Sequence, residues 1–168
     1  VEVTDEITGE SYCISGDVTI NASGAWMDGL LASDGLPDNR PRVNLSTAMN
    51  LVVKKELLKG SAAGVYGRFT NTLPNGETYN GRRVLFMAPW REYTIIGTFH
   101  KNYDGTPDEM RVGEAEIEEA IAEANSAVPN SPITREDVTF VLKGFLPMEG
   151  INAKNGEVDE NGHINATV

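Results

Sequence analysis

The stretch "RVLFMAPWREYTIIGTF", residues 83–99, consists of two apolar runs joined by the pair Arg91-Glu92. Apolar runs of this length with so short a connection predict a β-hairpin. Such runs suit strands that are buried on both faces, or that face helices on one side and a ligand on the other. The stretch therefore predicts an antiparallel sheet with a buried hairpin in it.

The segment after this hairpin has the pattern of an amphipathic helix over residues 113–127. Glu114 and Glu116 lie in its first turn, where they complement the helix dipole, and Pro129 ends it. The apolar face at helical spacing consists of Ile117, Ala120, Ile121, Ala124 and Val128. On the opposite face, Glu118, Glu119 and Glu123 are expected to be solvated rather than to bind a metal ion.

Shorter apolar runs predict further strands at residues 49–55, 63–71 and Val138–Leu142. Residues 1–24 alternate apolar and polar positions around turn residues, which predicts two to three more strands, the last at 18–20. A short helix is expected at Trp26–Leu31 and a loop at 32–42. This order of elements predicts an α+β fold, a mainly antiparallel sheet with the amphipathic helix packed on one face.

Composition narrows the class of protein. The chain has 168 residues, a size typical of one domain, and 25 acidic against 14 basic residues give a net charge of −11. This charge disfavours nucleic acid and anionic lipid as partners, because both are bound by lysine and arginine clusters. No signal peptide and no apolar run of about 20 residues is apparent, so a cytoplasmic protein without a membrane span is expected. Cys13, the single cysteine, is expected to be a small core residue and forms no metal cluster.

No short catalytic motif is present: the sequence contains no GxGxxG, no P-loop, no HExxH and no GxSxG. The two histidines, His100 and His163, are far apart in the sequence. The acidic residues that follow His100, at 104, 108 and 109, are better explained by turn formation than by Ca²⁺ binding. On motifs alone, the chain is an α+β domain without an assignable reaction.

Three longer segments change this interpretation. They are "INASGAWMDGLL" at 20–31, "GRRVLFMAPWREYTIIGTFHKNYDGTP" at 81–107, and the stretch from "VGEAEIEEAI" to "VLKGFLPM" at 112–148. In this order they resemble the middle of the FAD-dependent glycerol-3-phosphate dehydrogenases, within the D-amino-acid-oxidase-like flavoproteins. The resemblance covers residues 1–150 and implies a central fragment of such an enzyme, with the remainder of its FAD-binding domain outside this chain.

The resemblance also implies a cofactor site. "NASG" matches the strand end that runs close to FAD in the family, which makes Asn21, Ala22, Ser23 and Gly24 the expected cofactor contacts, with Trp26 packed behind the turn. Small side chains let the cofactor approach the main chain, and Gly24 permits a sharp turn. In the family, the flavin takes a hydride from a secondary alcohol and passes the electrons to an acceptor such as a quinone.

The substrate positions match the family poorly. The family's arginine that clamps the substrate phosphate falls on Leu146, its lysine and histidine fall on Thr47 and Asn50, and its Thr-Asp pair falls on Phe99 and His100. Leucine cannot replace a bidentate guanidinium at a phosphate. Asn50, His100 and Leu146 are therefore the expected substrate-binding residues, for a substrate other than glycerol-3-phosphate. Lys143, Arg91 or His100 could restore a positive charge, although Lys143 is more simply a surface strand residue.

The expected organisation is the end of the FAD-domain β-meander at 1–30, an antiparallel substrate-side domain at 31–150, and a polar tail or linker at 151–168. The expected protein is an FAD-dependent oxidoreductase of a small hydroxy compound, cytoplasmic or peripheral to the inner membrane. The catalytic residues are not identified, and the fragment alone is expected to be inactive. Two alternatives stay open: a non-catalytic binding or structural module derived from the family, and a relative that oxidises amines or amino acids.

Overall fold

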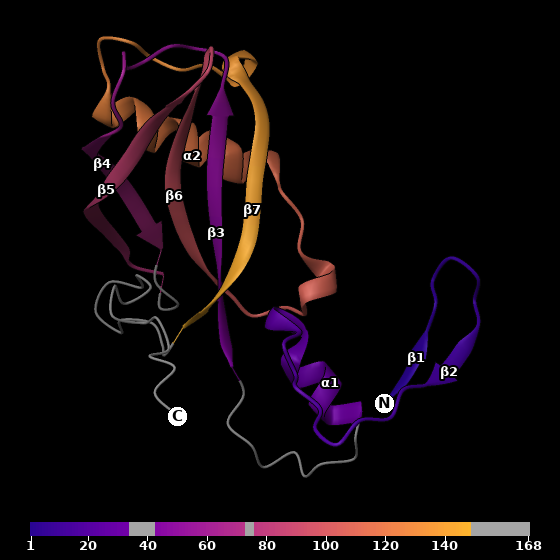
Figure 1. The fold of residues 1–168 in the computed structure, drawn as a ribbon. Helices are drawn as coiled ribbons and strands as arrows, with labels where there is room; N and C mark the ends of the chain where they lie inside the picture. Colours follow the sequence, from indigo (N-terminus) through magenta and orange to yellow (C-terminus); the bar gives the residue numbers. More distant parts are fainter. Residues whose placement is uncertain (34–42, 73–75, 149–168) are drawn as a thin grey trace. The chain divides into compact units, whose positions relative to one another are not determined.

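A computed structural model describes residues 1–33, 43–72 and 76–148 of the chain (Figure 1). The chain divides into two compact units, Val1–Arg40 and Pro41–Val168, which are described separately below. The expected tail at 151–168, with His163, and most of the expected loop at 32–42 lie outside the described residues.

The second unit contains a five-stranded antiparallel sheet with the strand order β4-β5-β6-β3-β7. Its strands are β3 (Asn44–Val53), β4 (Ala63–Thr72), β5 (Thr78–Trp90), β6 (Tyr93–Tyr103) and β7 (Val138–Met148). The predicted hairpin is formed by β5 and β6, and Trp90 pairs with Tyr93 across the two-residue turn. Arg91 in that turn has a φ of 58°, the left-handed conformation that tight hairpins need.

One helix, α2 (Glu114–Ala127), covers one face of this sheet, as Figure 1 shows. Two short 3-10 helices, η2 (Pro107–Glu109) and η3 (Arg135–Asp137), flank it in sequence. The predicted apolar stripe of the helix packs on the strands, so the expected α+β fold is confirmed. The fully buried core side chains of the strands are Met49, Leu51, Val53, Leu85, Met87 and Ile96.

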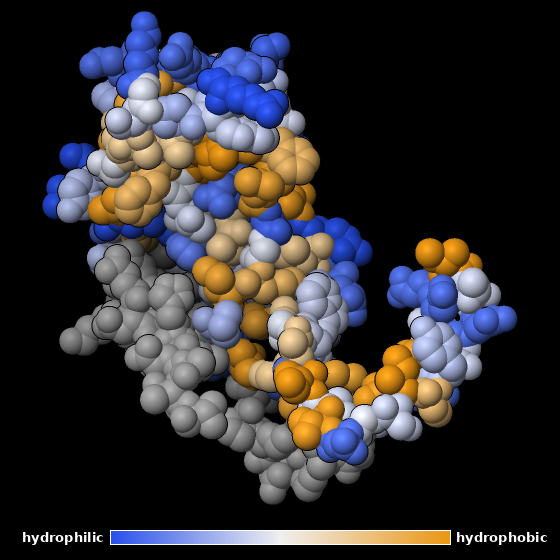
Figure 2. Space-filling model, viewed as in Figure 1, coloured by the Kyte–Doolittle hydropathy of each residue, from blue (hydrophilic) through white to orange (hydrophobic). Residues whose placement is uncertain are grey.

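On the opposite face of the sheet, called the open face below, no helix lies among the described residues of this unit. Strand alternation places on it Tyr66 of β4, Val84, Phe86 and Trp90 of β5, and Phe140 and Leu142 of β7, all of them exposed. Figure 2, which views the sheet from the side opposite α2, shows apolar side chains gathered over the strands. A single exposed apolar residue is ordinary, but a group of exposed apolar residues on one face is typical of a surface that contacts a ligand or another part of a protein.

The first unit contains a small hairpin of β1 (Glu2–Thr4) and β2 (Ser11–Cys13), then η1 (Gly24–Trp26) and α1 (Met27–Ser33). The expected strand at 18–20 is wrong, because Val18 and Ile20 are exposed and no described strand pairs with them. Cys13 is exposed as well, so its expected place in the core is also wrong. A hairpin of two three-residue strands buries little apolar surface, which explains the exposure of Cys13.

Candidate functional site

The three expected substrate residues lie on three neighbouring strands. Asn50 is on β3, His100 on β6 and Leu146 on β7, and all three are half-buried. His100 pairs with Ala48, and Leu146 pairs with Ser46, so the register links both residues to the open-face side of β3. Because alternate residues of one strand share a face, the three side chains belong to the open face. The structure thus gathers residues that are 96 positions apart in the sequence.

Asn50 lies at an irregularity in the sheet. The register between β3 and β6 shifts between Met49 and Asn50, and the Thr98 hydroxyl donates to Asn50 Oδ1 over 3.2 Å. Gly97 makes this arrangement possible, because a Cβ there would lie 2.0 Å from Asn50 Oδ1 and 3.0 Å from the Met49 carbonyl oxygen. The amide oxygen of Asn50 accepts the bond from Thr98, so Nδ2 is the group of Asn50 that can donate to a ligand on the open face.

The lysines of β6 and β7 do not lie on the open face. Lys143 Nζ donates to Glu116 Oε2 over 2.7 Å and to the Arg111 carbonyl oxygen over 3.0 Å, and its side chain is 8% exposed. Lys101 pairs with Glu119. Both acids are on α2, so both lysines lie on the helix side of the sheet. The interpretation of Lys143 as a surface residue is wrong, and so is the idea that it restores a charge beside Leu146.

Beneath the helix, Arg83 and Glu123 form a buried ion pair. Arg83 donates to both carboxylate oxygens of Glu123 over 2.6 and 2.8 Å, and the two side chains are 19% and 5% exposed. The guanidinium also lies 4.4 Å from the centre of the Phe69 ring and donates to the His100 carbonyl oxygen over 3.3 Å. The pair thus ties α2 to the backbone of the strand that carries His100.

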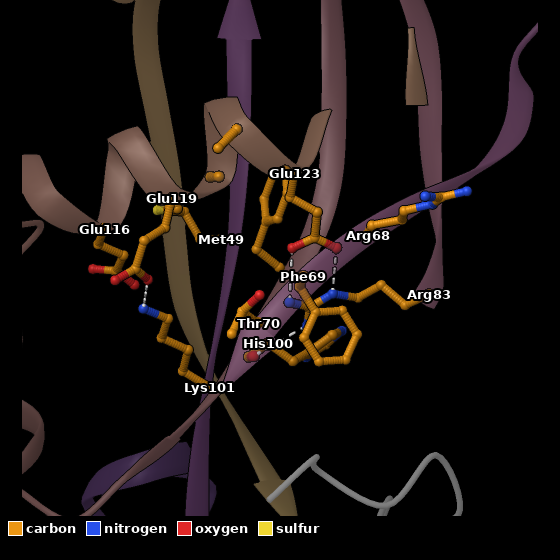
Figure 3. A pocket seen from close by; sticks show the side chains of 13 residues that line it. Met49, Arg68, Phe69, Thr70, Arg83, His100, Lys101, Glu116, Glu119 and Glu123 are labelled. Atoms are coloured by element: carbon orange, nitrogen blue, oxygen red, sulfur yellow. Dashed lines mark hydrogen bonds and ion pairs between the residues drawn. The ribbon is translucent and has the colours of Figure 1, made fainter. Parts of the chain in front are cut away.

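This ion pair lines a hollow of about 240 Å³ between α2 and strands β4, β5 and β6 (Figure 3). Two ion pairs lie among the lining side chains, Arg83 with Glu123 and Lys101 with Glu119. The sequence pattern assigned Glu123 to the solvated face of the helix, and the structure corrects this. The usable signal was Gly67, which faces the helix next to Arg83 and leaves room for the Glu123 side chain.

The expected cofactor residues form a turn in the first unit. Asn21 Oδ1 accepts hydrogen bonds from the Ser23 amide over 3.1 Å and from the Ser23 hydroxyl over 2.7 Å, an arrangement that bends the chain locally. Gly24 has a φ of 60°, so its expected role in a sharp turn is confirmed. Asn21 Nδ2 is buried and has no hydrogen-bond partner within the described residues. Trp26 ends η1 and is 49% exposed, and the Ala22 side chain is exposed.

Two negative findings apply to the described ranges 1–33, 43–72 and 76–148. No three histidine, cysteine, aspartate or glutamate side chains there gather closely enough to hold a metal ion. No helix there has the length and apolar character that crossing a membrane requires.

Comparison with known proteins relates both units to one group of enzymes. No family model matches the chain. It is 27% identical to the glycerol-3-phosphate dehydrogenase of Synechocystis over 98% of this chain and 29% of that protein. It is 26% identical to the alpha-glycerophosphate oxidase of Enterococcus casseliflavus over 96% of this chain and 25% of that protein.

A solved structure shows the same similarity as the sequence comparisons. The glycerol-3-phosphate dehydrogenase of Bacillus halodurans, complexed with FAD, matches with a TM-score of 0.70 and 26% identity, over 88% of this chain and 27% of that one. The chain therefore resembles the FAD-dependent glycerol-3-phosphate dehydrogenases and oxidases in sequence and fold, as the three segments predicted. It spans only about 25–29% of the length of these relatives.

Proposed function

We propose that this chain is the central, substrate-side segment of an FAD-dependent oxidoreductase that oxidises a small hydroxy compound. The observation that carries this proposal is the match in fold, over 88% of the chain, to a dehydrogenase complexed with FAD. In this proposal, residues 1–30 end the β-meander of the FAD domain, residues 31–150 form the substrate-side domain, and 151–168 are a tail or linker. The protein acts in the cytoplasm or at the inner membrane and passes its electrons to an acceptor such as a quinone.

The turn at residues 21–24 fits a bound dinucleotide. Asn21 Nδ2 is a buried donor without an acceptor among the described residues. Burying such a donor lowers stability unless a further group accepts its hydrogen bond. Gly24 presents open backbone, because no described atom lies within 4 Å of the place of a Cβ. Asn21, Ala22, Ser23 and Gly24 would hold the cofactor, with Trp26 beside it. When bound, FAD supplies the acceptor for the hydride of the substrate.

The open face around Leu146 argues for a substrate without a phosphate group. Lys101 of β6 and Lys143 of β7 both pair with glutamates of α2. A phosphate bound beside Leu146 would lack the charge-assisted hydrogen bonds that normally offset its desolvation. Asn50 and His100 offer uncharged or weakly basic polar groups instead, which suit a hydroxyl or carbonyl oxygen.

The test uses the full-length protein that contains this segment. We expect it to purify with bound flavin, and we expect the flavin absorbance to bleach anaerobically with a hydroxy acid or polyol but not with glycerol-3-phosphate. A colourless protein that takes up no FAD would support the alternative of a non-catalytic module. Bleaching by amines alone would support the amine-oxidising relative, and bleaching by glycerol-3-phosphate would contradict the substrate proposal. The isolated chain should reduce no FAD, because the dinucleotide cradle is incomplete.

Leu146→Arg should create affinity for glycerol-3-phosphate. A bidentate guanidinium–phosphate contact is worth about 1.5–3 kcal/mol, so binding should tighten by about tenfold or more. The measurement is the perturbation of the flavin spectrum during titration with glycerol-3-phosphate. Phe140→Arg is the matched control, because it places the same charge on the same face of β7, about 20 Å away along the strand and away from the position opposite Asn50. Equal gains in both variants would show that the position of the charge is irrelevant.

A further inference from the structure

Two arginines face each other across β4 and β5. Arg68 and Arg82 are direct partners in the register of these strands, so their side chains lie on the same face, the open one. The Arg68 amide donates to the Ser126 hydroxyl of α2 over 2.7 Å instead of to β5. Arg68 and Arg82 are therefore a non-hydrogen-bonded pair, the kind in which opposite Cα atoms are only about 4.5 Å apart.

Neither guanidinium meets a carboxylate among the described residues, and both side chains are exposed. By contrast, four other cations each pair with a glutamate: Arg83, Lys101, Arg135 and Lys143. Figure 3 shows the Arg68 side chain pointing away from the Arg83–Glu123 pair. Like charges directly opposite each other destabilise a sheet, so the pair costs stability unless an anion lies between them.

The pair is also held in place. The Ser126 bond fixes the backbone at Arg68, and the Arg82 guanidinium lies 5.5 Å from the centre of the Tyr66 ring, which restricts its motion. Two guanidinium forks with limited freedom form bidentate hydrogen bonds to an oxyanion at a reduced entropic cost. We propose that Arg68 and Arg82 form a binding site for a phosphate group or similar multivalent oxyanion. The site is on β4 and β5, at the opposite end of the strand order from Leu146 on β7, and it does not depend on the proposed redox function.

The experiment titrates inorganic phosphate into this chain at about pH 8, where phosphate is mostly dianionic. Binding is followed by calorimetry and by the melting temperature, with chloride at matched ionic strength as the reference. We expect phosphate to raise the melting temperature of the wild type above the chloride value, because a ligand of the folded state stabilises it. Arg82→Gln and Arg68→Gln should each weaken phosphate binding by about tenfold or more, which corresponds to loss of one charge-assisted contact.

A second measurement, made without phosphate, tests the repulsion between the two arginines. Without phosphate and at low ionic strength, Arg82→Gln should raise the melting temperature, because it removes the repulsion between the two guanidinium groups. Arg91→Gln is the matched control, since Arg91 is an exposed arginine that stands alone in the β5–β6 turn. It should leave phosphate binding unchanged. The proposal is overturned if phosphate and chloride act alike on the wild type, or if Arg91→Gln weakens phosphate binding as much as Arg82→Gln does.

Discussion

Glu123→Ala should lower the free energy of unfolding of this chain by about 3–5 kcal/mol. The substitution leaves the Arg83 guanidinium, 19% exposed, under α2 without its carboxylate. Removing one member of a buried pair costs far more than the pair contributes, because the remaining charge stays desolvated. The measurement is urea unfolding followed by circular dichroism. Since small domains have only about 5–15 kcal/mol of stability, the variant should lose a large fraction of it.

Glu119→Ala is the control for this prediction. Glu119 also pairs with a cation, Lys101, and lies one helical turn before Glu123, but the two side chains of this pair are 64% and 45% exposed. Exposed pairs contribute about 0–1 kcal/mol, so this variant should stay near wild type. Replacing both partners of the buried pair, as in Arg83→Met with Glu123→Leu, should recover most of the loss. Equal losses in Glu119→Ala and Glu123→Ala would mean that burial is not the cause.

Gly97→Ala should destabilise the chain by about 1–3 kcal/mol, the usual cost of inserting a methyl group where no space exists. The new Cβ would lie 2.0 Å from Asn50 Oδ1 and 3.0 Å from the Met49 carbonyl oxygen. The amide could rotate away, but the backbone carbonyl could move only with β3. The measurement is again the urea midpoint, together with amide hydrogen exchange at Asn50 and Thr98, which should become faster.

Gly144→Ala gives the matched comparison. Gly144 lies on β7, next to β3, and no described atom lies within 4 Å of the place of its Cβ. An alanine there should change the unfolding free energy by less than about 1 kcal/mol, the range of β-propensity effects. If Gly144→Ala costs as much as Gly97→Ala, backbone entropy rather than the close approach of Asn50 explains both values.

Local pattern was sufficient to predict the main elements. The break at Arg91-Glu92 predicted the hairpin, and the spacing of Ile117, Ile121 and Ala124 predicted the helix and its core face. The prediction missed the length of β7, which continues from Leu142 to Met148, because its second half includes Gly144 and Pro147. Both residues weaken a strand pattern, but pairing with β3 stabilises the strand regardless.

Contacts between elements determine the features that the local sequence pattern did not predict. Glu123 occupies a position that helical spacing assigns to solvent, and only the small Gly67 and the cation of Arg83 on neighbouring strands make its burial favourable. Lys143 likewise depends on Glu116. For the candidate site, the resemblance named Asn50, His100 and Leu146, and only the register shows that they share a face. The Arg68–Arg82 pair was not foreseeable, because it depends on the β4–β5 register rather than on spacing.

The bond from the Arg68 amide to Ser126 has a consequence for self-association. β4 is an edge strand, and edge strands with unpaired amides are templates on which other chains can add strands and aggregate. The Ser126 hydroxyl accepts the hydrogen bond of the outward-facing Arg68 amide, near the middle of β4. An incoming strand would need this amide to pair with β4. The helix that covers the core therefore also interrupts the exposed edge, and it does so with a single hydroxyl group that contributes little to the core.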